Sequence, residues 1–305
     1  MCFFSPHTDA LTPLRSQATA DRAPDHLADG TPTALRDDLI SLLGPTAVRS
    51  RVTDLVKYAT DASHLFPGLH QQDFGGSKLS HHKESLPAAF VAVSERAGHP
   101  LFIPPDVAGN CCATVWHSKG YNAGNILMAN RVVESMWRWS QQGALPIVCD
   151  ASSCTLGLKH EVLDYLSVES RERHKALTIY DSITWADEKL LPNLKVTQKA
   201  RSATVHPTCS MHTLGIDTTL RKIAAELAEK PFYPLTSTCC AFAGDRGLLH
   251  EELTRSATRD EAQEVTQRDL NLYLCANRTC EVGMEHATRA PYESFVYTLE
   301  EMTRA

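Results

Sequence analysis

Hydrophobic positions after about residue 85 follow two alternating patterns. Apolar residues recur at helical spacing in three segments, from Ile126 to Trp137, from Leu220 to Leu227 and from Phe295 to Met302. Among these segments lie short apolar runs of the kind that form buried strands, at residues 145–148, 176–180, 203–205, 232–235 and 270–274. Because short buried strands that alternate with helices usually pair in parallel, the pattern predicts an α/β fold with short parallel sheets flanked by helices.

The first 85 residues have a different character. Residues 1–33 combine four prolines with small polar residues and show no apolar period, so we predict a flexible leader. Residues 34–66 place leucines at helical spacing and predict a short helical N-terminal segment. Residues 67–85 lack periodicity and are expected to form a junction. Residues 86–305 therefore make up the main folded region.

Composition narrows the classes of function. The chain has 305 residues, of which 43% are hydrophobic and 22% are charged, as in globular proteins with a sizeable core. A net charge of -6 without a basic run argues against a nucleic-acid partner. No apolar stretch reaches the ~18 residues of a membrane helix, and the N-terminus lacks the basic start of a secretion signal. We therefore expect a cytoplasmic protein.

Ten cysteines are the compositional anomaly. Because a reducing cytoplasm disfavours disulfides, clustered cysteines there more often bind metal or take part in redox chemistry. Their spacing repeats along the chain. The matching segments are Cys111-Cys112-Ala113 with Cys239-Cys240-Ala241, and Cys149-x4-Cys154-x2-Gly157 with Cys275-x4-Cys280-x2-Gly283. This duplication predicts two repeated units, at about residues 86–200 and 201–305, each with its own cysteine set.

The cysteines fall where an α/β sheet usually gathers its ligands. In both halves a cysteine ends a predicted strand, and a second one opens the helix that follows. Helix N-termini favour thiolates and negatively charged clusters. The candidate ligands of the first set are Cys111, Cys112, Cys149 and Cys154, and those of the second set are Cys209, Cys239, Cys240, Cys275 and Cys280. The first set has no counterpart of Cys209, so the second set is the better candidate metal site.

The spacing also bears on the kind of centre. Neighbouring cysteines bind one small ion awkwardly because their side chains diverge, whereas vicinal thiolates suit a polynuclear cluster. The ferredoxin run Cys-x2-Cys-x2-Cys-x3-Cys-Pro is absent. The sequence therefore favours a non-cubane iron-sulfur cluster of the 4Fe-4S type. Zinc, or buried thiols that act as small hydrophobic residues, are the alternatives.

Three histidines are further candidate ligands. His160 and His286 occupy matching places about one turn into the helices of the two cysteine motifs, and His206 lies three residues before Cys209. Each could bind a cluster or support its ligands. A structural role, such as shaping the loop at His206, is the commoner one for histidines in such places.

Several motifs resemble one known family. They are Asp106-Val-Ala-Gly-Asn-Cys-Cys-Ala-Thr, Ser118-Lys-Gly-Tyr, Cys149-Asp-Ala-Ser-Ser-Cys, His206-Pro-Thr-Cys-Ser, Cys239-Cys-Ala-Phe-Ala-Gly-Asp-Arg-Gly and Ala276-Asn-Arg-Thr-Cys. Over roughly residues 86–302 they resemble the cysteine-rich C-terminal domain of large D-lactate dehydrogenases that depend on FAD and iron-sulfur clusters. The same domain resembles cluster-bearing subunits of heterodisulfide reductases and glycolate oxidase. Where that family has Cys-Cys-Gly, this chain has Ala113 and Ala241, a small-for-small change.

A second resemblance lies upstream. Residues 35–66, including Lys57-Tyr-Ala-Thr-Asp-Ala-Ser, resemble the first residues of the FAD-binding oxidase domain in the same enzymes. The family's glycine-rich FAD loop, substrate domain and ferredoxin-like segment do not follow, so the chain resembles such an enzyme with its middle removed. In the family, a further cysteine precedes the first doublet, and its place in this chain would be near Leu69. This chain has no cysteine there, so the resemblance does not imply a complete first cluster.

The resemblance implies a function for the chain. It implies the electron-transfer, iron-sulfur part of a D-lactate or D-2-hydroxyacid dehydrogenase-like oxidoreductase, with FAD bound by the full-length family and no catalytic residue in this chain. The implied partners are the flavin-containing dehydrogenase part and a quinone or cytochrome acceptor, with peripheral association at the inner face of the membrane. The alternative is a non-catalytic cysteine-rich protein that binds zinc or a protein partner.

Overall fold

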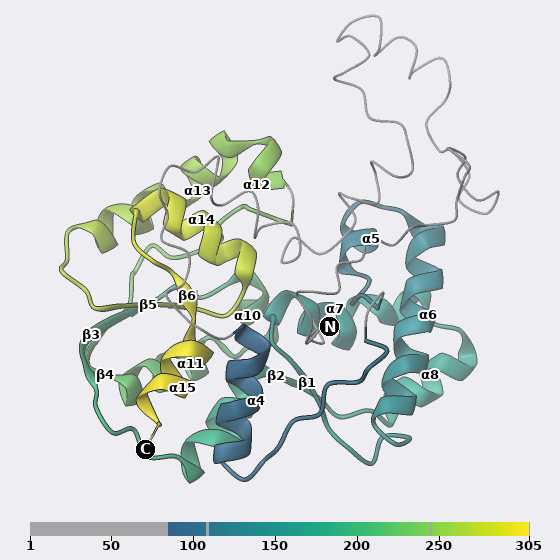
Figure 1. Cartoon of the computed structure of the whole chain (residues 1–305). Helices are drawn as coiled ribbons and strands as arrows, with labels where there is room; N and C mark the ends of the chain where they lie inside the picture. Colours follow the sequence, from purple (N-terminus) through teal and green to yellow (C-terminus); the bar gives the residue numbers. More distant parts are fainter. Residues whose placement is uncertain (1–84, 108–109, 245, 305) are drawn as a thin grey trace, which may run out of the picture.

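The computed structural model describes residues 85–107, 110–244 and 246–304. The predicted leader, the helical N-terminal segment and almost all of the junction lie outside the described residues. Within the described part, helices alternate with short parallel strands (Figure 1). The predicted α/β class is therefore confirmed.

The strands are spread from residue 147 to residue 294 and are mostly three to six residues long. They are β1 (Ile147–Cys149), β2 (Ile179–Asp181), β3 (Ala200–Val205), β4 (Ala228–Phe232), β5 (Leu272–Cys275) and β6 (Glu293–Ser294). The α-helices are α4 (Leu86–Arg96), α5 (Thr114–Ser118), α6 (Asn122–Trp139), α7 (Ser152–Lys159), α8 (Val168–Lys175), α9 (Ser182–Trp185), α10 (Cys209–Leu214), α11 (Asp217–Leu227), α12 (Arg246–Leu249), α13 (Glu251–Thr266), α14 (Arg278–Thr288) and α15 (Phe295–Met302). Shorter helical turns are η2 (Glu161–Tyr165), η3 (Ala186–Leu190) and η4 (Leu191–Asn193).

The strands form two parallel sheets. One contains β1 and β2, and the other has the order β4-β3-β5-β6. The two sheets repeat one detail, because Cys149 pairs with Asp181 in the first sheet and Cys275 pairs with Ser294 in the second. In both cases the partner residue accepts a hydrogen bond from the backbone of the helix that follows it. In both sheets, the cysteine at the end of one strand is thus paired with a residue that caps the helix after the neighbouring strand.

One predicted strand is misplaced. The apolar run at residues 232–235 was expected to form a strand, but β4 ends at Phe232. β4 is an edge strand in which Glu229 and Lys230 are exposed, and an edge strand does not need a continuous apolar run. Pro234 lies in the predicted run and has no N–H for a ladder hydrogen bond. The two-residue strand β6 was not predicted, because two residues show no periodicity.

Helices cover both faces of the larger sheet. Figure 1 shows α13 and α14 on one side of it and α11 and α15 on the other. The core on the α11 side includes Leu220, Ile223, Phe295 and Leu299, and it also takes in Phe90 of α4. A separate core joins α6 and α7 to the smaller sheet. Helix α4 precedes both cysteine sets, yet it packs with the C-terminal helix α15. The boundary between the two repeated units near residue 200 therefore stays a prediction.

A partly buried ion pair joins α4 to α15. Arg96 Nη2 lies 2.7 Å from Glu300 Oε1, and Arg96 Nη1 donates to Thr303 Oγ1 at 2.8 Å. Glu300 is only 3% exposed, so its carboxylate needs these donors to compensate for lost hydration. The contact holds together two segments of the chain that are 204 positions apart.

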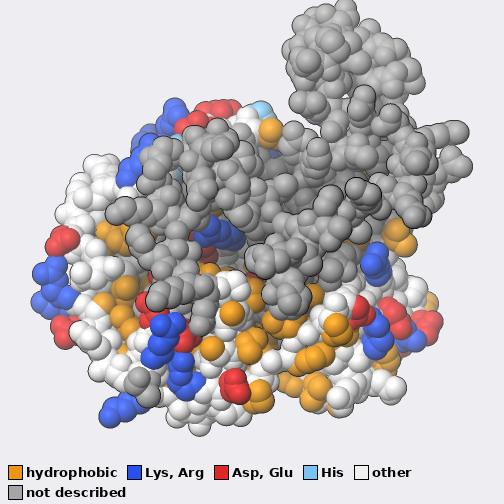
Figure 2. Space-filling model, viewed as in Figure 1, with side chains coloured by type: hydrophobic (Ala, Val, Ile, Leu, Met, Phe, Trp, Pro, Cys, Tyr) orange, Lys and Arg blue, Asp and Glu red, His pale blue; other side chains and the backbone are white. Residues whose placement is uncertain are grey.

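Charged side chains on the surface lie close to partners of opposite sign. Figure 2 shows basic and acidic side chains next to one another where α8 reaches the surface. On this helix Arg173 pairs with Glu169 at 2.6 Å and Lys175 pairs with Glu172 at 2.7 Å. None of the described helices has the length and apolar character needed to cross a membrane.

Candidate metal centre

The ends of two neighbouring strands position the second cysteine set. His206 directly follows β3, and Cys209 is the first residue of α10. Cys275 is the last residue of β5, and Cys280 lies in the first turn of α14. Because β3 and β5 are paired and parallel, their carboxyl ends lie at the same edge of the sheet. The sheet thus delivers four candidate ligands to one place.

The five cysteines of the second set form one connected group of sulfurs. Cys240 Sγ lies 3.1 Å from Cys280 Sγ, which also interacts with the Cys275 thiol. The Cys239 thiol interacts with the thiols of both Cys209 and Cys240. Cys240, Cys275 and Cys280 are buried, whereas Cys239 is partly exposed and Cys209 is exposed. The group therefore runs from the interior to the surface.

Close packing of the sulfurs shifts the pKa values of their thiols in opposite directions. The hydrogen bond from Cys209 holds the pKa of Cys239 well below its usual range, and the same contact raises the pKa of Cys209. Contacts with Cys239 and Cys280, followed by burial, raise the pKa of Cys240. Neighbouring thiolates repel one another unless a cation lies between them. Metal binding to such a set would therefore release protons.

A buried histidine lies beside these sulfurs. His206 is fully buried, and its Nδ1 lies 2.9 Å from each carboxylate oxygen of Glu261, which is 2% exposed. A ring nitrogen of His206 and the sulfurs of Cys240 and Cys280 all lie within 4.8 Å of one another. Two ligands bonded at about 2.0–2.3 Å to one tetrahedral ion lie roughly 3.5 Å apart, so a modest contraction would bring these atoms onto a metal. This Cys/His group is the candidate metal centre.

The donor set fits a metal or an iron-sulfur cluster. Nε2 of His206 is buried and has no hydrogen-bond partner among the described residues. Leaving a buried polar atom unsatisfied costs about 1–3 kcal/mol, and a metal bond would satisfy it. Thiolates and imidazole are also the ligands preferred by zinc and by iron-sulfur centres.

The sequence reasoning missed Glu261. This glutamate belongs to α13, where the other buried residues include Thr254, Thr258 and Val265. The spacing of four, three and four positions places Glu261 on the inward face of the helix. A carboxylate on such a face needs a buried partner, and this signal could have pointed to His206.

The other two candidate histidines lie elsewhere. His160 is exposed at the C-terminal end of α7. His286 is partly buried on α14, and its Nε2 lies 3.4 Å from Glu251 Oε1. Neither belongs to the group of three close donors, so the geometry favours the structural role for both.

The first cysteine set also gathers around its doublet. The Cys112 thiol interacts with those of Cys111 and Cys154, which lies in the first turn of α7. Cys149 is buried at the end of β1, and burial, together with the nearby Asp181 carboxyl, raises its pKa to about 12. Among the described residues, the one group of three donors within 4.8 Å of one another combines Cys240 and Cys280 of the second set with His206. The two sets are alike in layout and different in their non-cysteine neighbours.

The glycine of each repeated motif lies at a close approach to the segment of the doublet. A Cβ on Gly157 would lie 1.9 Å from Thr114 Oγ1 and 3.3 Å from the Cys112 carbonyl oxygen. A Cβ on Gly283 would lie 3.3 Å from Cys240 Cβ. The motif Cys-x4-Cys-x2-Gly therefore packs a helix directly against the Cys-Cys pair.

The third residue of each doublet motif has a left-handed backbone conformation. Ala113 has φ of 68° and Ala241 has φ of 54°, in the region that favours glycine. An L-residue in this region costs about 1–2 kcal/mol relative to its normal conformation. The change from glycine to alanine is small in volume, but it introduces backbone strain at both doublets.

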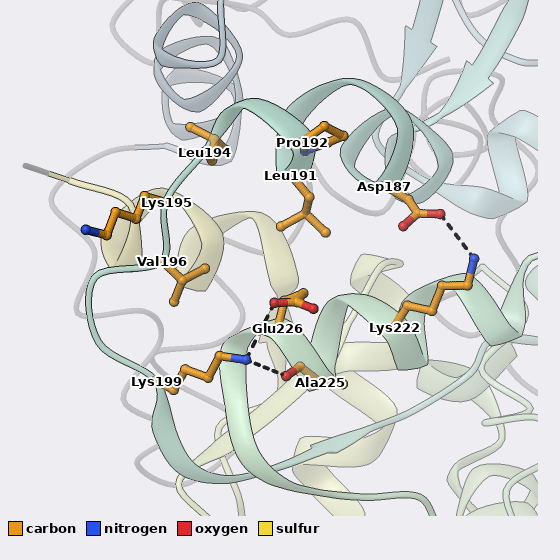
Figure 3. Close-up of a pocket in the computed structure, with 10 residues that line it drawn as sticks. All are labelled: Asp187, Leu191, Pro192, Leu194, Lys195, Val196, Lys199, Lys222, Ala225 and Glu226. Carbon is orange, nitrogen blue, oxygen red and sulfur yellow. Dashed lines mark hydrogen bonds and ion pairs between the residues drawn. The ribbon is translucent and has the colours of Figure 1, made fainter.

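A surface hollow between η3 and α11 is separate from this chemistry (Figure 3). Its lining includes neither cysteine nor histidine among the described residues. Both of its carboxylates pair with lysines, Asp187 with Lys222 and Glu226 with Lys199, each at 3.5 Å. The hollow therefore offers no free set of donors for a metal.

Comparison with known proteins supports the cysteine-rich assignment. The family model of a cysteine-rich domain, named CCG, matches residues 203–285. This segment includes all five cysteines of the second set, together with His206 and Glu261. No curated protein matches the chain. The region around the second set is thus similar to a CCG-type cysteine-rich domain, with a Cys/His group that could hold a metal.

Proposed function

We propose that this chain is an iron-sulfur electron-transfer module, with its principal cluster at the second cysteine set. The single observation that carries the proposal is the connected group of five sulfurs within the segment that matches the CCG domain. When bound, an iron-sulfur cluster supplies one-electron redox chemistry. The cluster we propose is a non-cubane 4Fe-4S type.

The number and placement of the sulfurs support a cluster over a single ion. A structural zinc ion takes four ligands, whereas this site offers five sulfurs and a histidine nitrogen. The buried cysteines would anchor the cluster and exclude water from it. The N-terminal end of α14 lies at Cys280 and favours the negative charge of thiolates.

The exposed side of the site suggests where electrons would enter or leave. Cys209 is exposed and Cys239 is partly exposed, so a redox partner could approach the centre from this side. In line with the sequence resemblance, we propose a flavin-containing D-lactate or D-2-hydroxyacid dehydrogenase part as the donor. A quinone or cytochrome would be the acceptor, reached by peripheral association with a membrane.

A mononuclear zinc site is the second candidate. The observation that favours it is the compact group of His206, Cys240 and Cys280, which has the size of a zinc site. A neighbouring cysteine of the set would complete four ligands. The protein would then serve a structural or partner-binding role.

Anaerobic purification followed by metal analysis separates the two candidates. Iron and acid-labile sulfide with a brown colour would support the cluster, whereas a colourless protein with one zinc per chain would contradict it. Cys240→Ser should lower bound iron more than Cys112→Ser, because the second set has the additional thiolate of Cys209. Equal iron loss in the two variants would contradict the assignment of the principal cluster to the second set.

The proposed role also excludes an independent dehydrogenase activity. We expect no D-lactate-dependent dye reduction by the purified chain, because the sequence lacks the flavin-binding loop of the family it resembles. Lactate oxidation by the purified chain with bound FAD would contradict this part of the proposal.

A further inference from the structure

We infer that His206 is a nitrogen ligand of the second centre, and that Glu261 is the positioning residue that aims its ring. The inference rests on the proposed function in that it assumes a metal or cluster at this cysteine set. It adds one nitrogen ligand to the cysteine ligands that the repeat predicts.

The contact with Glu261 determines which ring nitrogen is free. Both oxygens of Glu261 lie 2.9 Å from Nδ1, so we assign the ring proton to Nδ1, which donates a hydrogen bond to the carboxylate. In the neutral ring this leaves the Nε2 lone pair available. A metal-bound histidine commonly donates its other N–H to a carboxylate in this way, which orients the ring and increases its basicity.

Burial indicates that Nε2 has a partner other than water. His206 and Glu261 are 0% and 2% exposed, and Nε2 makes no hydrogen bond within the described residues. A ring nitrogen nevertheless lies within 4.8 Å of the sulfurs of Cys240 and Cys280. A buried ring nitrogen that lies close to two thiol sulfurs without a hydrogen bond of its own is the arrangement expected when a shared metal lies among them.

The backbone holds His206 firmly at this position. Its N–H donates to the Leu274 carbonyl at 2.9 Å, which extends the ladder between β3 and β5 by one step. Leu274 is immediately followed by Cys275, so the histidine and a cysteine of the set are fixed by the same pair of strands. Thr208 caps α10 two residues later and fixes the chain on the other side.

A nitrogen ligand would distinguish the second centre electronically from an all-thiolate one. Imidazole donates less charge to iron than thiolate does, and clusters in which histidine replaces cysteine have higher reduction potentials. The buried Glu261 carboxylate would compensate the charge that a cation places on the ring. The second centre should therefore be easier to reduce than the same centre with cysteine at position 206.

Pulsed EPR of the full chain tests the inference. The protein is reconstituted anaerobically with iron and sulfide, with histidine labelled as 14N or 15N. We expect a nitrogen hyperfine coupling that changes with the isotope, is lost in His206→Ala and is altered in Glu261→Gln. His286→Ala is the matched control, because His286 lies on α14 but pairs with Glu251, and it should leave the coupling unchanged.

A second variant keeps the inference testable if His206→Ala does not fold. His206→Cys should retain iron, lose the nitrogen coupling and show a lower reduction potential than the unmodified chain. A folded iron-sulfur protein without histidine coupling would overturn the inference and leave the proposed function standing.

If the chain binds zinc instead, X-ray absorption at the zinc edge should detect one nitrogen ligand that His206→Cys removes, and an all-sulfur shell would overturn the inference. Failure to bind either metal would contradict both proposals.

Discussion

Ser153 donates a hydrogen bond to the side-chain oxygen of Asn277 at 3.1 Å, although 124 positions separate the two residues. The amide group of Asn277 in turn donates to Cys280 Sγ at 3.4 Å. Nearby, the Ser152 hydroxyl lies 3.3 Å from that of Thr208, which caps the helix opened by Cys209. The first turn of α7 thus supports two helix starts of the second cysteine set.

A double-mutant cycle measures this support. Ser153→Ala and Asn277→Ala should show a coupling of about 1 kcal/mol in the free energy of unfolding, the value of one hydrogen bond. Urea unfolding of the metal-free chain provides the measurement. Ser118→Ala is the matched control, because the exposed Ser118 hydroxyl bonds only to a carbonyl three residues away. Additive effects of the two substitutions would show that the contact contributes nothing to stability.

Replacing Ala241 with glycine should stabilise the protein. The left-handed backbone at this residue strains alanine by about 1–2 kcal/mol, and glycine relieves that strain at a smaller cost in unfolded-state entropy. We expect a gain of about 0.5–1 kcal/mol in thermal or denaturant unfolding. Ala225→Gly, at an exposed position within α11, should instead lose about 1 kcal/mol. The same sign for both substitutions would be inconsistent with strain at the doublet.

Replacing Gly157 with alanine should destabilise the first half of the protein. The added Cβ would overlap Thr114 Oγ1, and overpacking of this kind costs about 1–3 kcal/mol. Thr114→Ala removes the overlapping atom, so the double variant should recover most of the loss. Hydrogen exchange in β1 and α7 would locate the effect, and an equal loss in the single and double variants would rule out the overlap as its cause.

Acid should weaken the contact between α4 and α15. Burial raises the pKa of Glu300, but hydrogen bonds from Arg304 and Arg96 outweigh it and hold the pKa below the usual 4.5. A lowered carboxyl pKa stabilises the folded state above about pH 4.5, and this contribution is lost as the pH falls through the folded-state pKa.

Glu300→Gln is the corresponding variant. It should cost about 1 kcal/mol at neutral pH, since both arginines are partly exposed and solvent screens the pairs. The difference from the unmodified chain should shrink on acidification from pH 5 towards pH 3, as followed by urea unfolding. Glu229→Gln, at an exposed position of β4, serves as control and should show little difference at either pH.

The strand ends were the most predictable part of the candidate site. Cys149 and Cys275 follow short apolar runs, and the structure places them at the last positions of β1 and β5. Cys154 and Cys280 lie in the first turns of α7 and α14, as their position after the strands predicts. These features were accessible because a strand period and a helix start are local properties of sequence.

Other features depend on contacts between distant segments and were not accessible in the same way. The sequence offers His206 as one of three candidate histidines, but its buried partner Glu261 lies 55 positions later, on a helix whose surface residues are mostly charged. The positive φ of Ala241 depends on the path of the chain around the second doublet rather than on the residue itself, because alanine does not favour that conformation. The strand β4 was misplaced because an edge position tolerates charged residues.

The pairing of Arg96 with Glu300 also has a consequence for the order of events during translation. At about 5–20 residues per second, a ribosome needs roughly 10–40 s to add the 204 positions between them. During that interval α4 exists without α15, so Phe90 and Val93 lack Phe295, Val296 and Leu299, the α15 side chains of the same core. Completion of this core therefore waits for the arrival of α15, which is among the last segments to be made.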